Sequence, residues 1–103
     1  MIKHLGLAYK AGKIKLGVDL SIICMQKNQA HLVLLAHDAS ELTKKKMRDK
    51  TSYYGIELIE SYSSVQMSSS LGRDNIKVVT VIDAGFKTLI KSNEGSDNHA
   101  KTI

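Results

Sequence analysis

The sequence has one cysteine, no proline and no tryptophan. The single cysteine, Cys24, excludes both an intrachain disulfide and a zinc site built from several cysteines. The longest unbroken apolar run, residues 32–36, is far shorter than the roughly 18 residues that a membrane helix needs. The N-terminus turns polar by Tyr9 and Lys10, which leaves no room for the apolar core of a signal peptide. We therefore expect a soluble cytoplasmic protein without a membrane partner.

Aromatic side chains are also scarce, with four tyrosines and one phenylalanine in 103 residues. A platform that stacks many unpaired bases on aromatic rings is therefore not expected. Charge is plentiful but uneven: residues 1–54 hold ten Lys and Arg against four Asp and Glu, whereas residues 55–103 hold five against six. A basic half is typical of a polyanion binder, because each neutralised phosphate releases counterions. The alternative is an ordinary solvated surface that is basic.

Helical and strand patterns alternate along the chain. Helices are predicted at 4–11, 17–27, 38–54, 63–71 and 83–91, and strands at 13–16, 32–36, 56–60 and 78–82. Two of the strands are apolar throughout, as in a sheet that is covered on both faces. This alternation predicts an α/β fold, a three-layer α/β/α sandwich with a mixed sheet of about four strands. We expect one domain over residues 1–91, followed by a polar mobile tail at 92–103.

No group of residues has the spacing of a catalytic or metal site. The glycines of segment 6–13 are too far apart for a phosphate-binding loop, and no two histidines are paired as metal ligands. Asp38 and Asp83 follow apolar strands, where the active sites of open α/β sheets lie. Each is predicted instead to cap the following helix, with Glu41 completing a capping box with Asp38. We predict a protein that is not an enzyme and that has no metal or cofactor.

Basic residues gather in two segments. Lys10, Lys13 and Lys15 lead into the helix that begins at Gly17. The N–H groups of a helix N-terminus can accept a phosphate there, although a solvated hairpin edge is the alternative interpretation. The second segment, residues 44–50, lies on one predicted helix, and a charged outer face is the simpler interpretation of it.

A series of segments in a fixed order carries a family resemblance. These segments are 5–13 with Gly17, 32–40, 43–46, 49–50, 53–54, 71–73 and 78–86. Together they cover residues 4–91, and they resemble bacterial YlxQ-type members of the kink-turn RNA-binding family named after ribosomal proteins seven-Ae and thirty-E. The resemblance implies a three-layer α/β/α fold and binding, without catalysis, to RNA bent sharply beside tandem sheared G·A pairs. The implied partners are structured RNA, either a kink-turn or ribosomal RNA, and the ribosome.

The resemblance assigns the first part of the RNA surface to the start of the second helix. Lys13 and Lys15 would neutralise phosphates, because a kink brings two phosphate backbones together. Gly17 would permit close approach, with Val18 and Asp19 at base edges in the major groove that the kink opens. These roles follow from the family pattern and from position in this sequence.

The resemblance completes the RNA surface with two loops. In the loop at 72–77, Ile76 would pack on the bulged nucleotide, and Arg73 and Lys77 would reach phosphates. In the other loop, His37 stands where the family commonly has an acidic residue, beside Asp38.

Three residues of the second helix depart from the family pattern. Asp19 stands in place of Asn, Leu20 in place of Glu and Ile23 in place of Lys. Asp19 can accept a hydrogen bond but cannot donate one, and a lost base contact is worth about 1–3 kcal/mol. The alternative function is a protein-interaction module that has lost kink-turn selectivity. It requires Leu20 and Ile23 to be exposed as an apolar patch.

Overall fold

A four-stranded sheet forms the centre of the computed structural model, which describes residues 2–92. The elements are α1 (Leu5–Lys10), β1 (Ile14–Leu16), α2 (Val18–Gln26), β2 (Leu32–Leu35), α3 (Glu41–Tyr54), β3 (Glu57–Ile59), α4 (Ser64–Leu71) and β4 (Val78–Val81). A final helix includes residues 84–92, so Ser92 belongs to that helix. The rest of the predicted tail, residues 93–103, lies outside the described residues.

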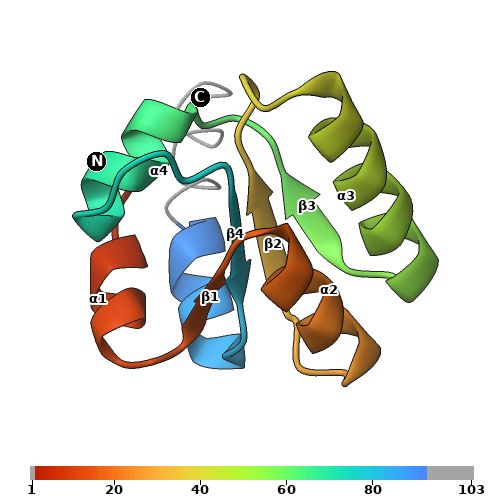
Figure 1. The fold of residues 1–103 in the computed structure, drawn as a ribbon. Helices are drawn as coiled ribbons and strands as arrows, with labels where there is room; N and C mark the ends of the chain where they lie inside the picture. Colours follow the sequence, from red (N-terminus) through yellow and green to blue (C-terminus); the bar gives the residue numbers. More distant parts are fainter. Residues whose placement is uncertain (1, 93–103) are drawn as a thin grey trace, which may run out of the picture.

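The strand order is β1-β4-β2-β3. β4 pairs antiparallel with β1 and β2, whereas β2 and β3 are parallel, so the sheet is mixed. Helices α2 and α3 cover one face, and α1, α4 and the final helix cover the other (Figure 1). The two apolar strands predicted from the sequence are the central pair, β2 and β4, and every residue in them is buried. The predicted three-layer α/β/α sandwich with a mixed sheet is confirmed.

Helix starts follow local capping chemistry, with one departure from expectation. Ser63 caps α4 in a full capping box, and Asp83 Oδ2 accepts a hydrogen bond from Phe86 N at 2.9 Å in the final helix. The prediction that Asp38 caps α3 together with Glu41 was wrong. Ser40 is the N-cap, and its Oγ accepts from Thr43 N. The chain first makes a turn in which Ala39 N donates to Ala36 O, and this turn places the N-cap of α3 two residues after the expected position.

The contact between α1 and α4 leaves no space for a side chain at Gly6. A Cβ at this position would lie 2.8 Å from the carbonyl oxygen of Ser70, closer than any ordinary contact. We expect Gly6→Ala to lower the free energy of unfolding by about 1–3 kcal/mol, because the two helices must separate. Urea denaturation measures this loss. Leu7→Ala on the exposed side of α1 is the control, with an expected change within about 0.5 kcal/mol. Equal stability of the two variants would contradict the close packing.

Candidate functional site

Three chain segments far apart in sequence meet at one end of the sheet. β1 ends where β4 begins, and Gly17 N donates to Val78 O at 2.9 Å. β2 ends beside the same point, and Ala36 N donates to Lys77 O at 2.8 Å. These two backbone hydrogen bonds hold the segments side by side. We call the resulting surface the loop edge and define it by three segments, residues 17–19, 36–39 and 72–77.

Gly17 gives the loop edge an open helix N-terminus. Its φ of 94° and ψ of 168° lie in a region that is essentially restricted to glycine. No atom lies within 4 Å of the position a Cβ would take, so the start of α2 is sterically accessible. Ser21 Oγ donates to Gly17 O at 2.7 Å and fixes the first turn. Asp19 is exposed, whereas Val18 is half-buried and packs against the core.

Asp38 connects the 36–39 turn to α4. Its Oδ1 accepts from Ser64 N at 2.7 Å, and its Oδ2 accepts from Ser64 Oγ at 2.6 Å. The side-chain and then the backbone hydrogen bond from Ser64 lower the pKa of Asp38 to about 2, and the charge of Lys77 contributes further. Asp38 thus holds the turn in place and keeps His37 exposed on the loop edge, where His37 N donates to Tyr62 O.

The lowered pKa predicts a pH-dependent contribution of Asp38 to stability. A folded-state pKa near 2, below the ordinary 3.8, means that the contribution is present above about pH 4 and is lost as pH falls through 2. We expect Asp38→Asn to be less stable than the native protein at pH 7 and to approach it near pH 2. Urea unfolding at both pH values tests this. Asp74→Asn, an exposed change on the same edge, is the control. A stability difference for Asp38→Asn that is equal at both pH values would contradict the prediction.

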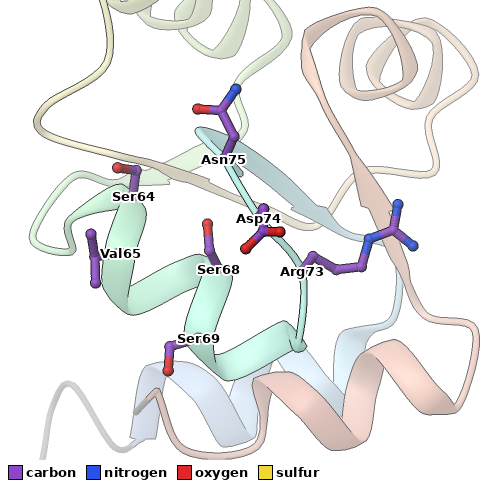
Figure 2. A pocket seen from close by; sticks show the side chains of 7 residues that line it. All are labelled: Ser64, Val65, Ser68, Ser69, Arg73, Asp74 and Asn75. Atoms are coloured by element: carbon purple, nitrogen blue, oxygen red, sulfur yellow. The ribbon is translucent and has the colours of Figure 1, made fainter.

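The 72–77 loop borders a hollow along α4 (Figure 2). The residues that line it are Ser64, Val65, Ser68, Ser69, Arg73, Asp74 and Asn75. Ser68 Oγ accepts from Ile76 N at 2.8 Å and so anchors the loop to the helix. Arg73 extends away from α4 (Figure 2), and its Nη1 donates to Tyr9 Oη at 3.0 Å. Ile76 packs partly against the core and is half-buried, as is Lys77, so only part of each side chain faces outward.

The structure brings together eight of the ten residues predicted for the site: Gly17, Val18, Asp19, His37, Asp38, Arg73, Ile76 and Lys77. Lys13 lies apart from them, because its carbonyl accepts from Ile82 N at the opposite end of β4. Four residues of extended chain put Lys13 about 13 Å from Gly17. Lys15 lies between these ends, exposed on edge strand β1.

Sequence reasoning missed the residues that hold the loop edge in place. Ser64 and Ser68 from α4 bind the 36–39 turn and the 72–77 loop, and Tyr9 from α1 binds Arg73. The sequence predicted a helix over residues 63–71, but it gave no sign of these partners.

The two carboxylates that suggested a small-molecule enzyme are both engaged in hydrogen bonds to helices. They belong to Asp38 and Asp83, and each accepts from the first turn of a helix. Among residues 2–92, no group of three or more His, Cys, Asp or Glu side chains is placed to hold a metal ion. None of the described helices has the length and apolar character to cross a membrane.

The fold and the loop edge define a small α/β/α protein that presents two loops and a helix N-terminus at one end of a mixed sheet. Residues 1–91 match the model of the Ribosomal protein L7Ae/L30e/S12e/Gadd45 family, and the chain belongs to this family.

Two relatives and a solved structure agree with this assignment. The chain is 40% identical over 82 residues to RNA-binding protein YlxQ of Enterococcus faecium, covering 80% of this chain and 79% of that protein. It is 42% identical over 82 residues to RNA-binding protein YlxQ of Bacillus subtilis (strain 168), covering 80% and 82%. A protein of unknown function from Bacillus halodurans C has a similar structure, with a TM-score of 0.83 and 30% identity over 89% of this chain and 96% of that one.

Proposed function

We propose that this protein binds structured RNA through the loop edge and carries out no catalysis. The convergence of the three loop-edge segments around an open helix N-terminus is the observation that carries the proposal. Two relatives at 40% and 42% identity are named RNA-binding proteins, which supports the same ligand. The targets we expect are a kink-turn or ribosomal RNA in the cytoplasm, with the ribosome as a partner.

The loop edge combines three kinds of contact that bent RNA requires. Arg73 and Lys77 supply positive charge for phosphates, and the N-terminus of α2 adds a partial positive charge. The absence of a side chain at Gly17 lets a nucleotide approach this helix end closely. The outward part of Ile76 provides an apolar surface for an extruded base. Lys13 and Lys15 would act outside this centre, on flanking phosphates.

Asp19 is the residue of the loop edge that bears most on selectivity. It is exposed in the first turn of α2, where its carboxylate can only accept hydrogen bonds. It would therefore select base edges that offer N–H donors and would repel a phosphate placed beside it. We propose that kink-turn recognition is retained, with Arg73 and Lys77 offsetting this local negative charge.

A binding titration tests the proposal. The probes are a standard kink-turn RNA and the same RNA with its sheared G·A pairs replaced by Watson–Crick pairs, each at two salt concentrations. We expect the kinked RNA to bind at least about tenfold more tightly, a difference of about 1.4 kcal/mol. Equal, steeply salt-dependent binding to both RNAs would contradict kink recognition. Absence of binding to either RNA would contradict RNA binding itself.

A further inference from the structure

A second surface lies between α2 and α3, on the face of the sheet that these two helices cover (Figure 1). The groove between them is lined by Asp19, Ile22, Ile23, Gln26, Lys46 and Lys50. Ile23 is 41% exposed there, and Leu20, one turn earlier on α2, is 47% exposed. The apolar patch that the protein-interaction alternative required is therefore present at the surface.

Lys46 and Lys50 differ from Lys44 and Arg48 of the same helix, each of which pairs with a carboxylate. Arg48 binds Glu60 with an Nη2–Oε1 distance of 2.6 Å, and Lys44 lies 3.6 Å from Glu41. Lys46 and Lys50 make no ion pair with any of residues 2–92. They are spaced i, i+4, so their ammonium groups form a row along one side of the groove.

Tyr53 continues this lysine row by one further turn of α3. Its side chain is 81% exposed, and it lines a shallow hollow together with Lys46, Asp49 and Lys50. Exposed tyrosines beside apolar and charged groups are typical of protein interfaces, where they serve as anchors. The α2–α3 face thus presents an apolar strip from α2, a row of unpaired positive charge from α3 and an aromatic side chain at its end.

We propose that the groove between α2 and α3 binds an amphipathic helix of a protein partner. Two neighbouring helices form a groove into which a third helix can pack its side chains. The apolar side chains of the partner would cover Ile22 and Ile23, and two carboxylates one turn apart would pair with Lys46 and Lys50. Charge complementarity therefore identifies the partner helix as apolar on one side and acidic along its flank.

The composition of the groove favours a protein over a nucleic acid. A phosphate backbone offers no apolar surface to cover Ile22 and Ile23. The groove borders the loop edge at Asp19, which belongs to both surfaces. Lys46 and Lys50 lie farther away, about 8 and 14 Å along α3 from the start of that helix.

Selection from a displayed library of helix-forming peptides, about 18 residues long, on the immobilised full chain tests this proposal. We expect enriched peptides to carry apolar residues at i, i+3 or i+4, and i+7, with two carboxylates one turn apart on the flank. Lys46→Glu with Lys50→Glu should weaken their binding at least about tenfold. Replacing the two peptide carboxylates with lysine should restore binding to this double variant. Lys10→Glu with Lys13→Glu, an equal charge change on exposed residues outside α2 and α3, is the matched control and should leave binding unchanged.

Three outcomes would overturn the proposal. In the first, the selection enriches no peptide. In the second, the enriched peptides bind the Lys46→Glu, Lys50→Glu double variant (the groove variant) as tightly as they bind the native protein. The third is tight binding of a 12-base-pair RNA duplex that the groove variant alone abolishes, which would assign the groove to nucleic acid. The Lys46→Glu, Lys50→Glu double variant should keep the preference for kink-turn RNA over the Watson–Crick control RNA, because neither lysine belongs to the three loop-edge segments, even though both line a groove with Asp19. This measurement distinguishes failure of the proposed helix binding in the groove from failure of the proposed RNA binding at the loop edge.

Discussion

Replacing Arg73 and Lys77 together with glutamine is expected to weaken binding of the kink-turn RNA about 100-fold. Both residues lie on the 72–77 loop: Lys77 directly precedes β4 beside the N-terminus of α2, and Arg73 reaches Tyr9 of α1. A hydrogen bond to a charged group contributes about 1.5 kcal/mol or more, and two such losses give this factor. The slope of log K against log salt should also fall by about 1.8, because two phosphates are no longer neutralised.

Lys10→Gln with Lys27→Gln is the matched control for this experiment. It removes the same charge from the C-terminal ends of α1 and α2, outside the residues assigned to RNA. The expected loss is less than about threefold, because exposed charges beyond a Debye length of about 8 Å are largely screened. Equal losses of RNA affinity in the two double variants would mean that positive charges contribute to binding wherever they lie on the surface. That result would contradict the assignment of RNA binding to the loop edge.

Gly17→Ala is expected to reduce both stability and RNA affinity. Forcing a side chain into a backbone conformation with φ 94° and ψ 168° costs about 1–3 kcal/mol, which urea denaturation measures as a lower free energy of unfolding. The strain also displaces the α2 N-terminus, and the new methyl group occupies the open space that a nucleotide would enter. RNA affinity of the folded variant, measured by titration, should fall at least about tenfold.

Gly12→Ala separates the two effects of the Gly17 substitution. Gly12 has a φ of 74°, so a side chain is strained there too, but the residue lies in the turn before β1, away from the loop edge. This variant should lose stability and keep its RNA affinity. Native RNA affinity in Gly17→Ala would contradict a role for the α2 N-terminus in binding.

The elements of this fold were predictable because their signals are local. The apolar runs at 32–36 and 78–82 identified the two central strands, which need covering on both faces. Gly72 marked the end of α4, where its φ of 64° suits a residue without a side chain. Each of these features depends only on residues a few positions apart, so no knowledge of the tertiary structure was needed.

The construction of the loop edge was less predictable because its contacts are long-range. Asp38 had the local pattern of a helix cap, but its partner is Ser64, which is 26 residues away. Lys13 and Gly17 are close in sequence, yet an extended strand places them at opposite ends of β4. The choice of Ser40 over Asp38 as the cap of α3 likewise depends on a turn that the contact with α4 holds in place.

The two outer strands of the sheet limit how the protein can associate with itself. β1 and β3 are the edges, and each has only three residues. Lys15 is exposed in the middle of β1, and Glu57 at the start of β3 pairs with Lys91 of the final helix. Short, charged edges offer a poor template for strand addition by a second molecule. We therefore expect the apolar central strands, which lie between these edges, to be protected from pairing with a second molecule.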